Sequence, residues 1–258
     1  MARAAVPGRL NWQVATLATA KVETATAKTL VLDVPDWAGH LAGQHVDVKL
    51  TADDGYSAQR SYSIASAPDG ARLELTVQRI DDGEVSPYLT EVMEPGDALE
   101  LRGPIGYWFV RDPRSTSPVL LVAGGSGVVP LMAMIRAHAV AQSKAPLRLI
   151  YSVRTPADVI YADELSQRSA ASPLEITYLY TRATPDAPDA PVADAGPVKA
   201  HAGRINADIL AETAWPPDAR PEVFVCGPSG FVEAASDLLV SAGQDPARIK
   251  TERFGPTS

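Results

Sequence analysis

The chain up to residue 112 alternates short runs of β-forming residues with turns. In residues 45–50, HVDVKL, apolar and polar side chains alternate as they do in a half-buried strand. Turns rich in Pro, Gly and Asp separate the runs. Six such runs, with a short helix interrupting them at 86–93, predict an antiparallel barrel or sandwich. The runs are residues 11–24, 27–35, 45–50, 59–65, 72–80 and 97–103.

The pattern changes near Asp112–Ser115, which we interpret as a linker between domain 1–112 and domain 113–258. From there strands alternate with helices, a pattern that predicts a parallel sheet covered on both faces. Residues 183–200 are rich in Pro, Ala and Asp and predict a mobile surface loop. The expected strands are 119–123, 147–153, 174–180, 222–226 and 248–251, and the expected helices are 129–142, 162–170, 206–213 and 229–242.

Composition narrows the classes of function. The 258 residues carry a net charge of −8, which argues against general nucleic-acid binding. The single cysteine, Cys226, cannot form an intramolecular disulfide or supply a four-cysteine metal site. The four histidines show no ligand spacing, so we predict surface or packing roles for them and no metal site. No run is long and apolar enough to span a bilayer, and the first residues lack the apolar core of a signal peptide, so we expect a cytoplasmic protein.

The stretch from Pro118 to Ile135 is the most informative in the second half. A buried strand is followed by Gly124-Gly125-Ser126-Gly127 and then by an apolar helix that starts near Pro130. Glycines at a helix N-terminus let the backbone approach a phosphate group. The alternative is an ordinary strand-to-helix turn, but its place on the first strand of an α/β unit favours an anion site.

Two motifs in the first half have a similar ambiguity. In Arg60-Ser61-Tyr62-Ser63, strand alternation puts Arg60 and Tyr62 on one face. The arginine could hold a phosphate and the tyrosine could stack on a flat ring, although a plain polar edge strand is about as compatible. Gly83-Glu84-Val85-Ser86 leads into the short helix and could form a second anion site. Its alternative is a plain N-cap, with Ser86 as the cap.

Two further features gain meaning only in combination. Cys226, with Gly227 and Pro228 after it, ends a buried strand, where a cysteine could fill the core or line a pocket. The stretch Thr251-Glu252-Arg253-Phe254 lies close to the end of the sequence, and four residues follow Phe254. An aromatic side chain in that position is usually incidental.

Taken in order, these motifs resemble the ferredoxin–NADP reductase family, in the form of the reductase components of bacterial oxygenases. The resemblance rests on RxYS at 60–63, GxxS at 83–86, GPxG at 103–106, GGSGxxP at 124–130, CGP at 226–228 and ERFG at 252–255. It covers residues 10–255 and implies a six-stranded antiparallel barrel that binds FAD, followed by an α/β domain that binds NAD(P).

The resemblance also implies roles for individual residues. Arg60 and Ser61 would lie at the flavin with Tyr62 packed on its ring, and Ser63 would hydrogen-bond near its N5. Gln78 and Arg79 would support the ring and ribityl chain, and Gly83, Val85 and Ser86 would hold the FAD phosphate. Gly125, Ser126, Gly127, Cys226 and Gly227 would line the nicotinamide site. Glu252 and Phe254 would sit at the flavin, with Phe254 shielding the face that nicotinamide must reach. Ser63, Cys226, Glu252 and Phe254 are the expected catalytic residues.

The choice between NADPH and NADH is predicted from the ends of the second and third strands. An acidic residue there would favour the ribose 2′-hydroxyl, and arginine favours a 2′-phosphate. The chain has Arg154 and Arg182 at these places, which favours NADPH, although Asp158 could pair with Arg154.

The electron acceptor is predicted from what the chain lacks. Many oxygenase reductases carry a fused [2Fe–2S] domain, and with one cysteine this chain is expected to hold none. We therefore expect a separate acceptor protein, such as a ferredoxin or an oxygenase component. One alternative is a stand-alone flavin or ferric reductase that uses diffusible acceptors, and another is a non-catalytic subunit that senses a flavin or nucleotide.

Overall fold

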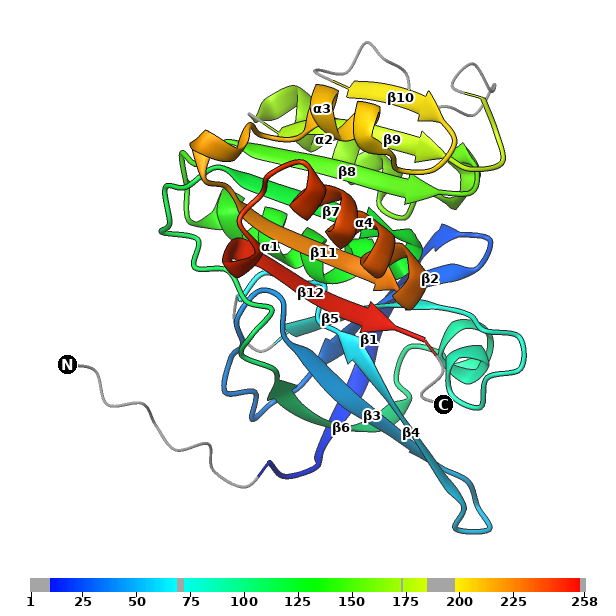
Figure 1. Ribbon diagram of the computed structural model, residues 1–258. Coiled ribbons are helices and arrows are strands. Elements are labelled where there is room, and N and C mark those ends of the chain that lie inside the picture. The colour runs from blue at the N-terminus through cyan, green and yellow to red at the C-terminus, as the bar shows by residue number, and fades with distance from the viewer. Residues whose placement is uncertain (1–9, 69–71, 173, 185–197, 256–258) are drawn as a thin grey trace, which may run out of the picture.

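The computed structural model describes residues 10–68, 72–172, 174–184 and 198–255. It has two six-stranded sheets, one in each half of the chain, which lie one above the other in Figure 1. Among the described residues, no helix combines the length and the apolar character needed to cross a membrane.

The first half forms a closed antiparallel barrel. Its strands are β1 (Gln13–Thr24), β2 (Ala27–Asp33), β3 (His45–Thr51), β4 (Ser57–Ser63), β5 (Arg72–Gln78) and β6 (Ala98–Ile105). They pair in the order β4-β3-β6-β1-β2-β5, and every pairing is antiparallel. A bridge between Ile64, just after β4, and Leu75 of β5 joins the two edges of the sheet. A barrel therefore forms, which removes the exposed edges that an open sheet would present.

The apolar positions of the barrel strands point inward. Leu73, Leu75 and Val77 alternate along β5 and are fully buried in the barrel core, as are Val46 and Val48 of β3. The alternation in the sequence therefore predicted the interior face correctly, because successive side chains of a strand point to opposite faces.

The second half is a parallel sheet covered by helices, as the sequence predicted. Its strands pair in the order β10-β9-β8-β7-β11-β12. Helices α1 and α2 pack on one face of the sheet, and α3 and α4 pack on the other. The strands are β7 (Val119–Gly124), β8 (Leu147–Val153), β9 (Leu174–Tyr180), β10 (Val198–Ala202), β11 (Glu222–Pro228) and β12 (Ile249–Phe254). The helices are α1 (Val128–Val140), α2 (Ala162–Ala171), α3 (Ala207–Thr213) and α4 (Ser229–Ser241), with single turns at Gly125–Gly127, Pro156–Asp158, Pro217–Ala219 and Pro246–Arg248.

Two strand predictions in this half were wrong. Residues 198–202 form β10, which pairs in parallel with β9, although the sequence predicted a loop over 183–200; residues 185–197 of that loop lie outside the described residues. Strand β12 continues to Phe254, beyond the predicted 251. Both are edge strands, whose backbone pairing with a neighbour stabilises short segments that local sequence patterns alone do not mark as strands.

Buried polar contacts hold the two halves together. The Arg136 guanidinium on α1 donates to the Glu74 carboxylate of β5 at 2.6 Å and to the Ala65 carbonyl at 2.9 Å. On its other side it donates to Glu164 of α2. The buried Tyr161, which precedes α2, donates its hydroxyl hydrogen bond to Thr76 of β5. These contacts set one position of the α/β domain on the barrel.

Candidate functional site

The glycine turn lies at the switch point of the parallel sheet. Strands β8, β9 and β10 lie on one side of β7, and β11 and β12 lie on the other. The carboxyl ends of β7 and β11 are therefore the place where an open α/β sheet binds ligands. The single turn Gly125–Gly127 follows β7 there and leads into α1.

Close packing explains why these positions are glycines. A Cβ atom at Gly127 would lie 2.1 Å from the carbonyl oxygen of Cys226. One at Gly124 or at Gly227 would meet the ring of Phe231 at 2.7 or 2.9 Å. The turn thus lies directly on the backbone of β11, and Phe231 covers both strand ends.

A cleft opens between this turn and the barrel. Its volume is about 260 Å³. Gln78 of β5 lines it from the barrel, and its Oε1 lies 4.0 Å from where a Cβ of Gly125 would stand. The remaining walls come from the carboxyl ends of the parallel strands and from α4. They are Gly124, Gly125, Ser152, Val153, Arg154, Asp158, Ile160, Thr181, Pro228 and Phe231.

Cys226 and Glu252 are neighbours on β11 and β12 at the same edge. They are register partners in the parallel ladder. Cys226 is fully buried, and burial together with the Glu252 charge raises the pKa of its thiol well above the usual value. Burial also raises the pKa of Glu252 to about 7. The thiol is therefore an uncharged wall, whereas the carboxyl group can change its charge near neutral pH.

His45 reaches this edge from the barrel. Its Nδ1 lies 3.7 Å from Oε1 of Glu252, and Ser63 stands directly opposite it in the ladder between β3 and β4. The structure therefore brings Ser63, Cys226 and Glu252, which are far apart in sequence, to one junction between the domains. The sequence did not single out His45, because a lone histidine on an alternating strand has no motif around it.

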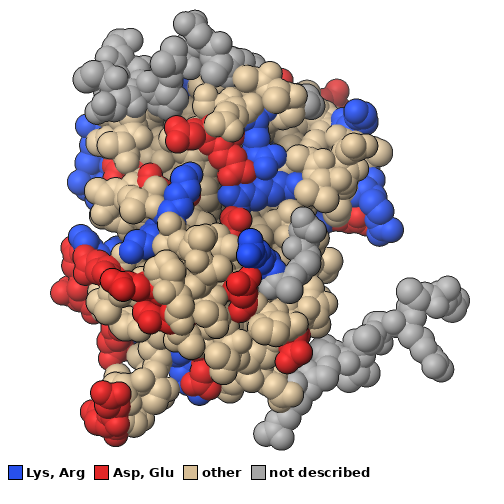
Figure 2. Space-filling model, turned by 180° about the vertical axis from the view of Figure 1, so that it is seen from behind, with Lys and Arg blue, Asp and Glu red and all other residues tan. Residues whose placement is uncertain are grey.

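Arg60 and Tyr62 lie farther along β4. The Arg60 side chain is 54% exposed, and its Nη2 donates to Glu84 at 3.0 Å. Tyr62 is partly buried against the barrel core, and burial raises its pKa to about 12. Figure 2 shows acidic side chains gathered along one edge of this domain. A phosphate group could bind Arg60 by displacing Glu84, since an exposed ion pair contributes only about 0–1 kcal/mol.

The short helix begins at Ser86, as the sequence predicted. Ser86 and Pro87 are its first helical residues, and Tyr88–Val92 continue it as a π-helix without a side-chain cap. The Ser86 hydroxyl accepts a hydrogen bond from the Ile80 amide at 3.1 Å, so it holds the preceding loop rather than capping the helix, which was the alternative that the sequence left open. A Cβ at Gly83 would lie 2.9 Å from both the Ile80 carbonyl oxygen and Ser86 Oγ, so this closed loop requires glycine there.

Two other predicted site residues, Arg79 and Ser61, pair with neighbouring acidic side chains. Arg79 is paired with Asp81 at 3.0 Å and with Glu91. The Ser61 hydroxyl donates to Asp47 at 2.7 Å, on the strand face opposite to Tyr62. Their predicted contacts with a flavin stay predictions.

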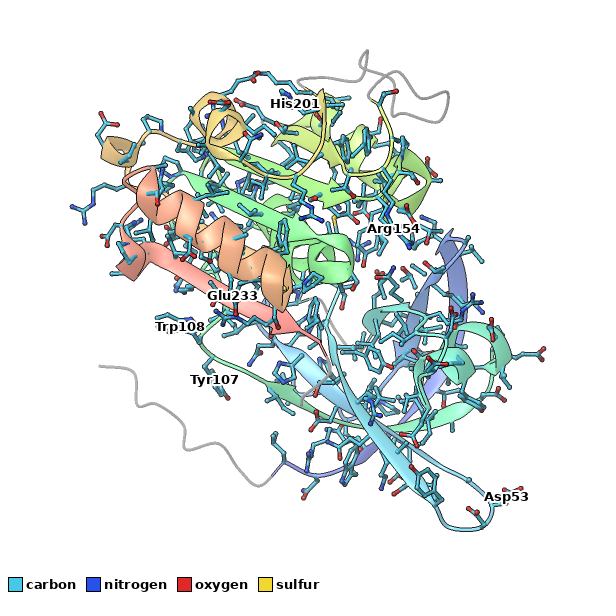
Figure 3. All side chains as sticks on the ribbon, turned by 45° about the vertical axis from the view of Figure 1, so that its right-hand side comes forward. Asp53, Tyr107, Trp108, Arg154, His201 and Glu233 are labelled. Atoms are coloured by element: carbon cyan, nitrogen blue, oxygen red, sulfur yellow. The ribbon has the colours of Figure 1, made fainter. Side chains whose placement is uncertain are left out.

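Arg154 lines the far end of the cleft, and Arg182 follows the cleft-lining Thr181 in the chain. Arg154, labelled in Figure 3 at the edge of the α/β domain that faces the barrel, pairs with Asp158 at 2.8 Å. Asp158 is itself held by the amide and hydroxyl of Thr155 at 3.0 and 2.8 Å. Arg182 is exposed and donates its amide hydrogen bond to the Arg154 carbonyl at 2.8 Å. Asp158 therefore neutralises one of the two cations.

Phe254 ends β12 beside this junction. It pairs in register with Pro228 and packs, partly buried, against the core of the α/β domain. It therefore belongs to the edge strand β12, and its predicted place at the flavin stays a prediction. Phe231 and Thr181 also line the cleft, and the sequence missed them because nothing in a helix start or a strand end marks them.

The residues present fit a flavin and a nicotinamide dinucleotide. The barrel offers an arginine, a tyrosine and a glycine loop that a Cβ would close, and the α/β domain offers a glycine turn at the switch point. These are groups that bind phosphate and flat rings. Among the described residues, no group of three or more His, Cys, Asp or Glu side chains could hold a metal ion.

Comparison with known proteins agrees with this division of the chain. Residues 15–109 match the oxidoreductase FAD-binding domain family, and residues 121–237 match the oxidoreductase NAD-binding domain family. The chain is 38% identical over 217 residues to a ferredoxin–NADP reductase B of Sorangium cellulosum, with coverage of 83% of this chain and 84% of that protein.

Two further relatives extend the comparison. The chain is 33% identical over 216 residues to a glycine betaine monooxygenase reductase subunit of Chromohalobacter salexigens. This match covers 83% of the present chain but only 56% of that protein's length. The solved structure of the flavohem-like FAD/NAD-binding domain of a nitric oxide dioxygenase from Vibrio cholerae superimposes with a TM-score of 0.81 at 26% identity. That match covers 95% of this chain and 99% of the other.

Proposed function

Since this chain belongs to the ferredoxin–NADP reductase-like family of FAD- and NAD-binding oxidoreductases, we propose that it takes a hydride from NADPH onto FAD and passes the electrons to a separate acceptor protein. Residues 1–112 would hold the flavin, and residues 113–258 would hold the dinucleotide. The observation that carries this proposal is the cleft in which Gln78 of the barrel faces the glycine turn of the α/β domain.

The barrel residues would hold and orient the flavin. Arg60 would bind its pyrophosphate after Glu84 swings away, and Tyr62 would pack on the ring. Val85 and Ser86 would lie at the phosphate behind the loop at Gly83. Ser63, at the junction with Cys226 and Glu252, would donate a hydrogen bond to the ring. Bound FAD supplies the hydride acceptor, so the protein needs to contribute alignment and a suitable electrostatic environment.

The α/β domain would bind the nicotinamide nucleotide at its glycine turn. Gly125, Ser126 and Gly127 would carry the nucleotide, and Cys226 with Gly227 would form a wall against the nicotinamide. The buried, uncharged thiol suits that place, because a small neutral side chain lets a flat ring come close. Phe254 would shield the flavin and would move aside for hydride transfer.

NADPH is favoured over NADH by Arg154, which lines the cleft, and by Arg182, which follows the cleft-lining Thr181. Arg182 is exposed, and Arg154 could turn from Asp158 to a 2′-phosphate at small cost, because its side chain is half exposed. The relative from Sorangium cellulosum, whose name includes NADP, supports the same choice. The name of the Chromohalobacter relative supports an oxygenase component as acceptor, and the first supports a ferredoxin.

Anaerobic stopped-flow spectroscopy tests the proposal. The purified protein should carry a flavin that is released as FAD, and NADPH should bleach it with a higher kcat/KM than NADH. The bleached protein should then reduce a ferredoxin. A bound flavin that neither NADPH nor NADH bleaches supports a sensing subunit instead. Rapid reoxidation by free flavin or oxygen, with none by ferredoxin or an oxygenase component, supports a reductase with diffusible acceptors.

A further inference from the structure

The outward face of β5 is the part of the barrel on which the α/β domain lies. The inward positions of this strand fill the barrel core, so the alternate positions Glu74, Thr76 and Gln78 point outward. Glu74 pairs with Arg136 of α1 at 2.6 Å. Thr76 accepts a hydrogen bond from the hydroxyl of Tyr161. Gln78 lines the cleft opposite the glycine turn. Contacts between the domains and one wall of the cleft therefore share a single strand face.

The contact at Thr76 continues a directed chain of hydroxyl groups inside the barrel. Thr29 of β2 donates to the Glu23 carboxylate at 2.9 Å, so its oxygen accepts from Thr76 at 2.7 Å. Thr76 has then given its only proton, and it accepts from Tyr161. The Glu23 side chain is 4% exposed and accepts from Lys21 at 3.2 Å. The chain thus ends on a fixed negative charge, which strengthens and orients every hydrogen bond in it.

Tyr161 is held in a backbone conformation that a bulky residue rarely adopts. Its φ is 63° and its ψ is 30°, in the left-handed region. The side chain is fully buried, and the Arg136 guanidinium lies over its ring, 5.1 Å from the centroid. Ile160, the residue before it, lines the cleft, and α2 begins at the residue after it. Strain of this kind persists where the surrounding structure imposes it, and it is common beside functional sites.

Hydride transfer requires a close approach across the domain boundary. In the proposed function, on which this inference rests, the barrel holds the flavin and the glycine turn holds the nicotinamide. The two rings react only when their reacting atoms are about 3–3.5 Å apart and aligned. Their separation is therefore set by the contacts that place one domain on the other. Among the outward residues of β5, Thr76 is the immediate neighbour of Gln78 at the cleft, and Glu74 lies one position farther away.

We propose that Tyr161 is a positioning residue for hydride transfer. Its hydroxyl holds Thr76, and with it the cleft end of β5, at a fixed distance from the glycine turn. Tyr161 is buried behind Ile160, so it acts on the alignment of the two rings without touching the nucleotide. The directed hydroxyl chain sets the position, while the ion pair of Arg136 with Glu74 holds the domains together.

Stopped-flow measurements on the flavin-containing protein test this role. Tyr161→Phe keeps the ring and leaves Thr76 donating to Thr29, so no buried donor loses its partner. The limiting rate of flavin bleaching at saturating NADPH should fall roughly tenfold, because a displacement of a fraction of 1 Å misaligns the rings. The Kd for NADPH and the rate of reoxidation by ferricyanide should stay unchanged. An unchanged bleaching rate, a weaker Kd alone, or equal slowing of both half-reactions would overturn the proposal.

Two further variants show whether the effect belongs to this one contact. Thr76→Val removes the same hydrogen bond from the barrel side and should slow bleaching to the same extent. The combined variant should be no slower than either single variant, since both lose one shared contact; effects that multiply would contradict this. Tyr178→Phe is the matched control. Tyr178 is equally buried, but it packs on Tyr151 within the α/β domain, so its bleaching rate should be that of the unmodified protein.

A distance measurement tests the positioning without turnover. Cys226 is the only cysteine and is buried, so spin labels can be placed on cysteines introduced at Val22 of β1 and Val140 of α1, which are 70% and 65% exposed. Pulsed dipolar spectroscopy should give a shifted or broader distance distribution in Tyr161→Phe than in the otherwise unmodified protein. Identical distributions would refute the positioning role. If neither NADPH nor NADH bleaches the flavin of the unmodified protein, the proposed function is wrong, and these distances still decide whether Tyr161 fixes the domains.

Discussion

Substitution of Gly127 by alanine tests how closely the glycine turn must lie on β11. The added Cβ would stand 2.1 Å from the Cys226 carbonyl oxygen and 2.7 Å from the Gly227 amide nitrogen. Both atoms belong to the backbone of a central strand, so neither can rotate away. Gly127 has φ −60°, which alanine adopts freely, and steric overlap is therefore the whole effect.

The overlap gives the size of the expected effect. An ordinary contact requires the turn to withdraw from β11 by roughly 1 Å, and overpacking of this kind costs about 1–3 kcal/mol in the free energy of unfolding. The same movement displaces the wall of the cleft against which a nicotinamide would lie. A misplacement of about 1 Å can slow an aligned reaction by about 10²-fold.

Urea denaturation and stopped-flow bleaching of the flavin measure the two effects separately. Flavin content should stay unchanged, because the barrel holds the flavin in our proposal. Gly230→Ala in the first turn of α4 is the control, since its Cβ meets no atom within 4 Å and alanine favours a helix. If Gly127→Ala is as stable as the control and is reduced at the same rate, the turn does not define the cleft wall.

Three further substitutions test other parts of the site. Asp158→Asn should free Arg154 from its ion pair. The ratio of the affinity for 2′-AMP to the affinity for 5′-AMP, measured by calorimetry, should then rise by up to roughly fivefold. An unchanged ratio would mean that Arg154 does not bind the 2′-phosphate. Arg136→Met leaves the Glu74 carboxylate of the barrel without its arginine and should lower the unfolding free energy by roughly 3 kcal/mol, whereas the exposed-surface control Arg114→Met should not; equal values would contradict a stabilising contact between the domains. Because folding raises the pKa of Glu252 from 4.5 to about 7, the folded state holds its proton more tightly, so stability should fall by up to about 3 kcal/mol as pH rises from 4.5 to 7. Glu252→Gln should abolish that fall, and a fall of the same size in this variant would assign it to other groups.

Much of the fold could be predicted because its elements have strong local patterns. The alternating strands of the barrel and the fully apolar β7 both bury side chains at the spacing that the sequence shows. Two edge strands were the exceptions. Residues 198–202 follow a run rich in Pro, Ala and Asp, and residues 252–254 contain one apolar side chain. They become strands because β9 and β11 offer them unpaired backbone groups.

The site was predictable to a smaller extent. Motifs led to Gly125, Arg60 and Cys226, because glycine turns and arginine strands have recognisable spacings. His45 and Phe231 have no such spacing. His45 reaches the site only through the packing of the barrel on the α/β domain, and Phe231 reaches it because α4 packs over the ends of β7 and β11. The pairing of Ser86 with Ile80 likewise depends on how a loop folds back, which no local pattern records.

The sequence by itself determined the two-domain order, the barrel interior and the place of the glycine turn, since these follow from side-chain periodicity and from the conformations that glycine allows. Only the tertiary structure decided that Arg136 pairs with Glu74 and that His45 meets Glu252 across the domain boundary. The physical reason is that burial and charge pairing depend on distances between residues far apart in the chain. The charge state of Glu252 is therefore a property of the assembled junction between the domains.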